Sequence, residues 1–106
     1  MLRHGERLDY TQRDLGNNWT AKSDRPFDPP LTDHGCEQGT LAGGRITELT
    51  TSLNIAPVSV AYTSPLIRCG QTITHAKGNL PSVTSPVKIE AGLVESINED
   101  WYVVKC

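Results

Sequence analysis

The chain has 106 residues and a formal net charge of −2, with ten basic and twelve acidic side chains. This length allows one domain at most, with room for one modest core. The charges are balanced and no basic run alternates with aromatic residues, which argues against a nucleic-acid partner. No apolar stretch approaches the length of a membrane span, and charged residues begin at Arg3 without the apolar core of a signal peptide. We therefore expect a cytoplasmic protein with no membrane partner.

The three cysteines, Cys36, Cys69 and Cys106, lie more than thirty residues apart. Their odd number and wide spacing match neither a disulfide framework nor a Cys-x-x-Cys metal site, so we expect free thiols. A cysteine phosphatase needs Arg at the sixth position after its cysteine, and Ala42 and His75 occupy those positions here. The sequence therefore argues against a cysteine nucleophile.

Residues 5–30 are rich in Asp, Arg, Asn, Gly and Pro and have no apolar periodicity, which predicts a long ordered loop. Loops of this length inside a compact domain are usually functional or disordered. We expect residues 8–30 to form part of a pocket wall. The aromatic residues Tyr10, Trp19 and Phe27 would then either contact a substrate or pack locally.

A helix is predicted to begin after Thr32, which is a suitable N-cap. Apolar residues recur there at spacings of four, three and four and would form one face: Ala42, Ile46, Leu49 and Leu53. Gly39, Gly43 and Gly44 each weaken a helix by up to about 1 kcal/mol relative to Ala. They indicate either close backbone packing or a poor helix.

Residues 58–62 form a short β-branched run that is typical of a buried strand. A second helix is predicted over residues 65–77, with Ser64 as N-cap, Pro65 at the first helical position and Gly78 as the stop. Residues 87–89 are a second strand candidate, and a glycine-containing turn follows at residues 91–92. Residues 101–104 form a later apolar run.

The order helix, strand, helix, strand predicts an α/β layered fold with a mainly parallel sheet. Ligands of such folds bind outside the carboxyl ends of the strands. We expect Arg3, His4, residues 64–68 and Glu95 to follow strand ends at one edge of this sheet.

The chain opens with Arg3-His4-Gly5-Glu6-Arg7, which places a potential nucleophile between two cations. A neutral imidazole can attack phosphorus, and guanidinium groups can hold phosphoryl oxygens in bidentate fashion. The motif alone is equally compatible with an exposed basic turn in which Gly5 supplies the bend.

Four segments that occur in order resemble the N-terminal half of the histidine phosphatase superfamily, which includes the cofactor-dependent phosphoglycerate mutases. These segments are residues 3–7 (RHGER), 30–38 (PLTDHGCEQ), 62–72 (YTSPLIRCGQT) and 90–95 (EAGLVE). The resemblance implies a three-layer α/β/α fold. The continuation Glu6-Arg7-Leu8-Asp9 is most similar to the branch of ubiquitin-associated and SH3 domain-containing phosphatases and steroid-phosphate phosphatases. Mutases usually carry a small hydroxyl residue and then Asn after the tetrad, which in this chain is Arg3-His4-Gly5-Glu6.

The resemblance also implies the roles of the site residues. His4 would be the nucleophile that becomes phosphohistidine, and Arg3, Arg7 and Arg68 would bind the phosphoryl group. Such cations stabilise the negative charge of the phosphoryl group during its transfer. They also disfavour an imidazolium, which keeps His4 neutral and nucleophilic. Glu95 would be the general acid that protonates the leaving oxygen and later accepts a proton from water.

Each role has an alternative. Arg68 could be an ordinary solvated helix cation, and other acidic side chains lie close to Glu95 in sequence. Asp33 more readily complements a helix dipole than does chemistry. His34 and His75 have no partner at metal-ligand spacing, and we expect both on helix surfaces, with no metal and no cofactor.

Two departures from the family pattern lead us to expect residues 1–106 to be a partial domain. Only Met1 and Leu2 precede the tetrad, where the family has a full hydrophobic strand, and no second catalytic histidine follows in a C-terminal half. We expect hydrolysis of a phosphorylated small molecule or phosphoprotein, which could belong to a longer parent protein. A non-catalytic phosphate-binding or interaction fragment is the alternative, and mutase activity a more distant one.

Overall fold

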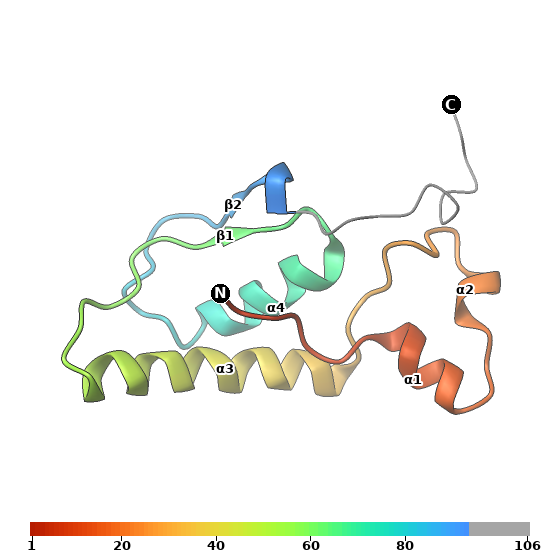
Figure 1. Ribbon diagram of the computed structural model, residues 1–106, viewed down its shortest axis with the longest axis horizontal. Coiled ribbons are helices and arrows are strands. Elements are labelled where there is room, and N and C mark those ends of the chain that lie inside the picture. The colour runs from red at the N-terminus through yellow and green to blue at the C-terminus, as the bar shows by residue number, and fades with distance from the viewer. Residues whose placement is uncertain (94–106) are drawn as a thin grey trace.

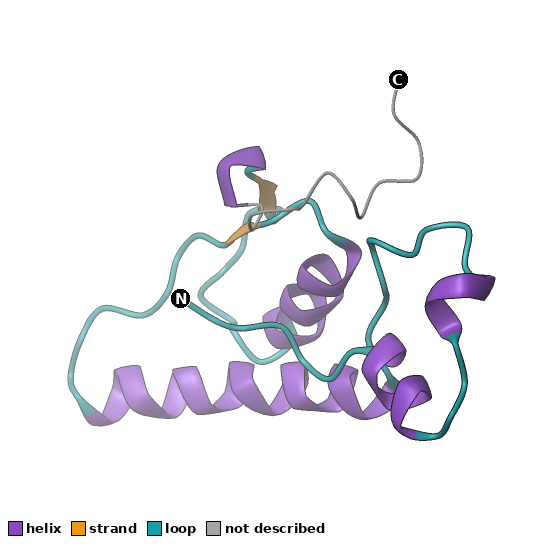
Figure 2. Ribbon diagram, turned by 45° about the vertical axis from the view of Figure 1, so that its right-hand side comes forward, coloured by secondary structure: helices purple, strands orange, loops and turns teal. Residues whose placement is uncertain are grey.

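The computed structural model describes residues 1–93 of the chain. Its elements, in chain order, are α1 (Leu8–Asp14), α2 (Trp19–Lys22), α3 (Asp33–Ser52), β1 (Tyr62–Thr63), α4 (Ile67–Lys77), β2 (Lys88–Ile89) and the 3₁₀ helix η1 (Ala91–Leu93). Figure 1 shows α3 and α4 on the same side of the two strands, with α4 nearer to them, and Figure 2 shows the same order after a turn of the molecule. The predicted alternation of helix and strand is confirmed by α3, β1, α4 and β2.

The two strands are parallel and α4 forms the crossover between them. Tyr62 lies opposite Lys88 and Thr63 opposite Ile89. The predicted parallel pairing is confirmed, and the prediction for residues 87–89 nearly matches β2. The prediction of a strand over residues 58–62 was correct only at its end, because β1 begins at Tyr62. Residues 58–60 pair with no strand in the described part of the chain, so their β-branched composition alone does not make a strand.

Helix α3 packs against α4 through glycines. Its three buried residues are Gly35, Gly39 and Gly43, spaced four apart on one side of the helix. A methyl carbon on Gly39 would come within 2.9 Å of the Thr72 carbonyl oxygen, and one on Gly43 would overlap the Ala76 carbonyl. The glycines therefore let the two helix backbones touch, which confirms the close-packing interpretation for Gly39 and Gly43.

The predicted apolar face of α3 was wrong in its second half. Leu49 is 40% exposed, and Leu53, the residue that follows the helix, is 63% exposed. Ala42 and Ile46 are half-buried, and Ile46 packs against the small core. The physical reason is that the side of α3 that carries the glycines faces α4. The Leu49 and Leu53 side chains therefore have nothing that buries them in the described structure.

The core is small and lies around α4. It consists of Ala61, Ala76, Leu80 and Val83, with four half-buried side chains packed against them: Ile46, Val58, Ile73 and Val87. The residue before β1, the end of α4 and the segment that follows α4 thus supply the buried apolar surface. No helix in the described part of the chain is long and apolar enough to cross a membrane.

The prediction of a long ordered loop over residues 5–30 was wrong in part, because this region contains α1 and α2. Neither helix has a buried residue, so neither needs the apolar period by which a helix is recognised in a sequence. Local contacts organise them instead: the Asn18 side chain accepts a hydrogen bond from the Ala21 backbone N–H at 3.1 Å and caps α2.

The ends of α4 agree partly with the prediction. The helix ends at Lys77 with Gly78 as its C-cap, as predicted, but it begins at Ile67 with Leu66 as N-cap. The Ser64 hydroxyl accepts from the Leu66 N–H at 3.3 Å, which orders the turn before the helix. The first amide of α4 is bound by the carboxylate of Asp28, 39 residues earlier in the chain.

Candidate active site

The tetrad crosses α4 at Thr72. The Gly5 N–H donates to the Thr72 hydroxyl at 3.1 Å, and that hydroxyl donates to the Arg68 carbonyl oxygen at 2.8 Å. Thr72 is buried, so its hydroxyl fixes the chain beside His4 to the turn of α4 that carries Arg68. Thr72 was not among the site residues expected from the sequence, although it stands in one of the family-like segments.

His4 is half-buried, and its Nδ1 lies 2.8 Å from the Gly5 carbonyl oxygen. A carbonyl oxygen only accepts hydrogen bonds, so Nδ1 is the nitrogen that carries the proton in this arrangement. In the neutral imidazole the lone pair is then on Nε2. The contact thus selects the tautomer in which Nε2 can act as a nucleophile.

His4 lines two adjoining hollows. One, of about 230 Å³, lies between the tetrad and the two long helices, and Arg3, Gln38 and Thr72 also line it. The other, of about 240 Å³, brings His4 together with Thr63 and Ser64 at the carboxyl end of β1. No strand precedes Arg3 in the described structure, so the expectation that Arg3 and His4 follow a strand end was wrong. His4 nevertheless reaches the strand end through tertiary packing.

Glu6 anchors the tetrad to the start of α3. Its N–H donates to Gln38 Oε1 at 2.8 Å, and its carbonyl oxygen accepts from the Thr32 N–H at 3.0 Å. The Thr32 hydroxyl donates to the Glu6 carboxylate at 2.7 Å and also accepts from the Gly35 N–H at 3.0 Å. The hydrogen bond from the Gly35 N–H confirms Thr32 as the N-cap of α3. The hydrogen bond to the Glu6 carboxylate shows a structural role for Glu6 that was not expected from the sequence.

Arg68 is 3% exposed, so its interpretation as an ordinary solvated cation was wrong. It stands in the first turn of α4, where the unpaired N–H groups carry partial positive charge. The Asp28 carboxylate accepts from the first of these, the Ile67 N–H, at 2.8 Å, and also from Arg25 at 3.0 Å. A carboxylate therefore already satisfies the helix end, and the Arg68 guanidinium is the full positive charge that this turn carries.

The Arg7 side chain is held by residues of the adjoining helix α1. Its Nε and Nη2 donate to the two carboxylate oxygens of Asp9 at 3.0 and 2.8 Å, and its Nη1 donates to the Tyr10 hydroxyl at 2.8 Å. An isolated antiparallel bridge pairs Arg7 with Leu31, and the Leu8 N–H donates to the Pro30 carbonyl at 2.9 Å. These contacts bring the first two family-like segments together.

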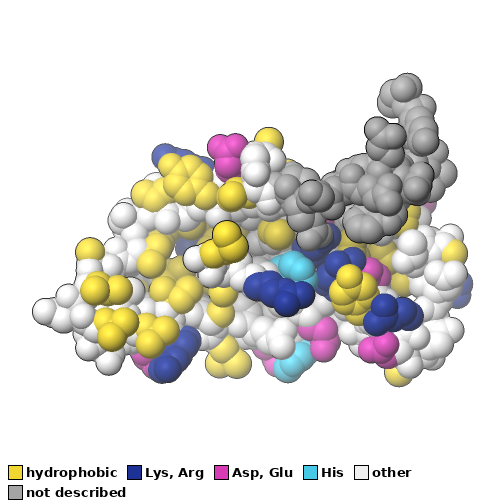
Figure 3. Space-filling view, viewed as in Figure 1, with side chains coloured by type: hydrophobic (Ala, Val, Ile, Leu, Met, Phe, Trp, Pro, Cys, Tyr) yellow, Lys and Arg dark blue, Asp and Glu magenta, His cyan; other side chains and the backbone are white. Residues whose placement is uncertain are grey.

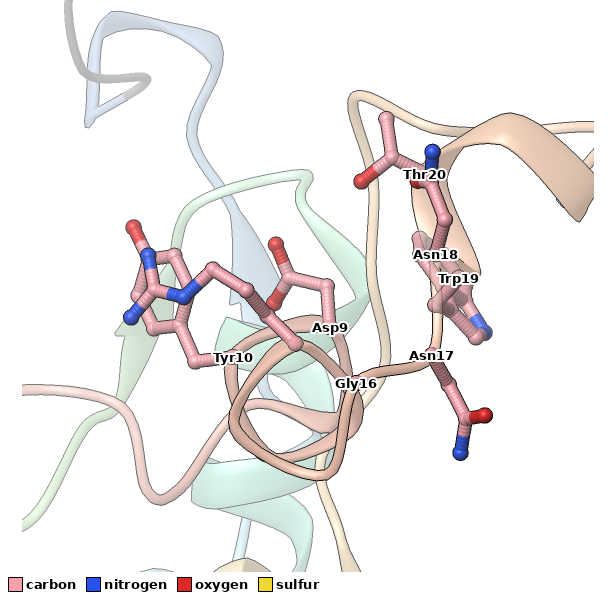
Figure 4. A pocket seen from close by; sticks show the side chains of 8 residues that line it. Asp9, Tyr10, Gly16, Asn17, Asn18, Trp19 and Thr20 are labelled. Carbon is pink, nitrogen blue, oxygen red and sulfur yellow. The ribbon is translucent and has the colours of Figure 1, made fainter.

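A larger hollow of about 480 Å³ lies between α1 and the start of α2. Figure 4 shows Asp9 and Tyr10 projecting from α1, with Asn17, Asn18 and Trp19 on the facing segment. Two of the three aromatic residues singled out in the sequence thus line a hollow. The third, Phe27, does not line this hollow and lies 5.7 Å below the Arg25 guanidinium.

The remaining predicted residues fall outside the site or outside the described structure. His34 and His75 are both exposed on helices, as expected, and Asp33 stands in the first turn of α3. Cys36 and Cys69 are half-buried free thiols. Glu95, Cys106 and the apolar run 101–104 lie outside the described residues. Within residues 1–93, no three His, Cys, Asp or Glu side chains form a group that could hold a metal ion.

The structure therefore places half-buried His4 beside Arg3 in one hollow and connects their segment to the turn of α4 that carries Arg68. On the face shown in Figure 3, a histidine and basic side chains lie next to each other near the middle of the molecule. The family model described as histidine phosphatase superfamily, branch 1, matches residues 1–103. The chain belongs to this superfamily, and its function is of the phosphatase or mutase type. A search of curated proteins gave no match.

Proposed function

We propose that the chain hydrolyses phosphomonoesters through a phosphohistidine on His4, either alone or as part of a longer protein. His4 Nε2 attacks phosphorus, and the bond from phosphorus to the ester oxygen breaks as Glu95 protonates that oxygen. Water then attacks the phosphohistidine, the P–N bond breaks, Glu95 accepts the proton of the water, and inorganic phosphate leaves. Arg3, Arg7 and Arg68 bind the phosphoryl oxygens throughout.

The observation that carries this proposal is the hydrogen-bonded connection from Gly5 through Thr72 to Arg68. It fixes the segment that holds the nucleophile to the helical turn that holds a buried guanidinium. The tautomer of His4 supports it further, since Nδ1 is engaged by the Gly5 carbonyl. An adventitious basic turn would need neither feature.

The finer class follows from the residues after the tetrad. Asp9 holds Arg7 in this structure, and Glu6-Arg7-Leu8-Asp9 resembles the branch of ubiquitin-associated and SH3 domain-containing phosphatases and steroid-phosphate phosphatases. We therefore place hydrolysis ahead of mutase activity. The substrate would be a phosphorylated small molecule or a phosphoprotein. A cytoplasmic location stays a prediction.

We also propose that residues 1–106 are part of a three-layer α/β/α domain. Both long helices of the described structure lie on one side of β1 and β2 (Figures 1 and 2). Tyr62 is 57% exposed, and its register partner Lys88 is also exposed, whereas the next pair, Thr63 and Ile89, points to the side of α4. A second helical layer would cover the Tyr62 and Lys88 side chains, as parallel sheets require.

Hydrolysis of an aryl phosphate by the purified chain tests the proposed function. The matched variants are His4→Ala and His34→Ala, because the His34 side chain is exposed on α3 and its ring lies beside Glu37. We expect turnover in the wild type and in His34→Ala and none above background in His4→Ala. Rapid quenching should trap an acid-labile, base-stable phosphoryl group on His4.

Three other results would each change the conclusion. Binding of inorganic phosphate without turnover by the wild type would identify a non-catalytic phosphate-binding fragment. Transfer of the phosphoryl group to a second phosphoglycerate position would identify a mutase. A phosphoryl adduct on Cys36 or Cys69 would overturn the histidine mechanism.

A further inference from the structure

The Arg7 side chain is held more firmly than that of an ordinary surface arginine. Its side chain is 16% exposed and that of its partner Asp9 is 11% exposed. The pair forms two hydrogen bonds in the fork-to-fork arrangement that guanidinium and carboxylate prefer. Tyr10 adds a hydrogen bond and places its ring 4.0 Å from the Arg7 guanidinium carbon.

The remaining donors of Arg7 can be counted. A guanidinium has five N–H groups. Asp9 accepts one from Nε and one from Nη2, and Tyr10 accepts one from Nη1. Among residues 1–93, one N–H of Nη1 and one N–H of Nη2 therefore have no partner. These N–H groups can donate hydrogen bonds to the oxygens of a phosphoryl group.

A neighbouring ion pair of the same helix differs from this arrangement. Asp14 lies on the same helix and meets Arg13 at 3.6 Å, but both of those side chains are more than 70% exposed. Such exposed pairs orient little, because the side chains keep their rotamer freedom. Arg7 and Asp9 are shielded from water and held at several points, so their geometry persists.

We propose that Asp9 is a positioning residue of the phosphoryl-transfer site, which acts by holding Arg7. Its carboxylate takes the fork formed by Nε and Nη2 and leaves one N–H of Nη1 and one of Nη2 for phosphoryl oxygens. This inference rests on the proposed function and goes beyond it, because it assigns a carboxylate to the binding of an anion. Asp9 contributes orientation, and its own charge works against the anion.

Two effects of removing Asp9 thus oppose each other. Loss of the carboxylate frees Arg7 to adopt other rotamers, which weakens phosphate binding. It also removes a negative charge near the site, which strengthens phosphate binding by a simple Coulomb effect. A double-mutant cycle separates the two, because the orienting effect needs Arg7 and the charge effect does not.

The experiment measures the dissociation constant of inorganic phosphate by calorimetry on the full chain at fixed ionic strength. The variants are Arg7→Ala, Asp9→Asn, the double variant and Asp14→Asn, which removes the same charge from the same helix. Thermal unfolding of each variant checks that it folds. Aryl phosphate turnover is measured in parallel.

We expect Arg7→Ala to weaken phosphate binding by about ten-fold or more and Asp9→Asn by about three- to ten-fold. In the Arg7→Ala background, Asp9→Asn should change affinity by less than about two-fold, and Asp14→Asn should do the same in the wild type. An unchanged or tighter complex in Asp9→Asn would overturn the inference. Equal weakening in the Arg7→Ala background would overturn it as well.

The inference and the proposed function can fail separately. Phosphate binding that depends on Asp9 in a chain without turnover would refute hydrolysis and support the positioning role. Turnover that is unaffected by Asp9→Asn would refute the positioning role alone. A wild type that binds no phosphate and turns over no ester would refute both.

Discussion

Gly5 and Gly35 lie in contact through their backbones. A methyl carbon on Gly5 would overlap the carbonyl oxygen of Gly35, and one on Gly35 would overlap the Glu6 carbonyl oxygen. The tetrad therefore lies directly on the first turn of α3, with no side chain between the two backbones. This contact sets the depth at which His4 lies in the site.

Substitution of Gly5 by Ala should displace the tetrad. Overpacking of a tight contact costs about 1–3 kcal/mol, and here the obstructing atoms belong to the backbone of Gly35 and cannot rotate away. We expect a lower unfolding temperature and loss of most phosphate affinity, measured by thermal unfolding and calorimetry. Gly70→Ala is the control, because nothing lies within 4 Å of an added methyl there. Wild-type phosphate affinity in Gly5→Ala would contradict the close contact.

Two adjacent glycines of α3 should respond in opposite directions. Gly43→Ala would drive a methyl group into the Ala76 carbonyl and separate α3 from α4, at a cost of about 2 kcal/mol. In Gly44→Ala the methyl group meets only the Asn79 side-chain nitrogen, at 3.8 Å, so the higher helix propensity of Ala should stabilise by up to about 1 kcal/mol. Thermal unfolding should place the midpoint of Gly43→Ala below the wild type and that of Gly44→Ala at or above it. Equal midpoints would show that the helices do not approach as closely as described.

Asp28→Ala should destabilise α4 from a distance. The carboxylate caps the Ile67 N–H and pairs with Arg25, and its side chain is 6% exposed. Loss of a helix cap costs about 0.5–2 kcal/mol, and we expect the upper part of this range because the freed amide is partly buried. Chemical denaturation measures the change. Asp24→Ala, at an exposed neighbouring position, serves as the control and should change stability by less than about 0.5 kcal/mol.

Thr72→Val should weaken the site while it keeps the shape of the side chain. Valine cannot accept from the Gly5 N–H, so that amide loses its partner, and we expect a cost of about 1–2 kcal/mol. Thr74 on the same helix makes the same kind of bond to the carbonyl four residues earlier, at 2.7 Å, but is exposed. Thr74→Val is therefore the matched control. If both variants lost phosphate affinity equally, the Thr72 hydroxyl would have no special role in holding the tetrad.

The sequence allowed the prediction of those elements whose signals are local. A few neighbouring residues are enough to predict the Thr32 cap, the Gly78 stop and the second strand near residue 88. The order of helices and strands is enough to predict the parallel crossover through α4. The ordered family-like segments indicated the superfamily, which the family model confirms over residues 1–103. Helix caps and family motifs can both be recognised in the sequence without knowledge of the tertiary packing.

Other features escaped prediction because they depend on partners far along the chain. The capping of α4 by Asp28 joins residues 39 positions apart, and the Gly5 amide meets Thr72 across 67 positions. The helices α1 and α2 escaped because they bury no side chain and show no apolar period. The exposed Leu49 and Leu53 were misjudged because periodicity marks an apolar face without showing what covers it.

The sequence by itself determined the chemistry that is available here: an imidazole between two guanidinium groups, a third arginine after a short strand, and an order of motifs that defines a superfamily. Tertiary structure alone decided how those groups are held. It buried Arg68, engaged Arg7 with Asp9 and fixed the His4 segment on Thr72 and Gly35. The physical reason is that burial and backbone contact arise from segments that meet only when α3 and α4 pack, whereas the reactive groups are a property of each residue.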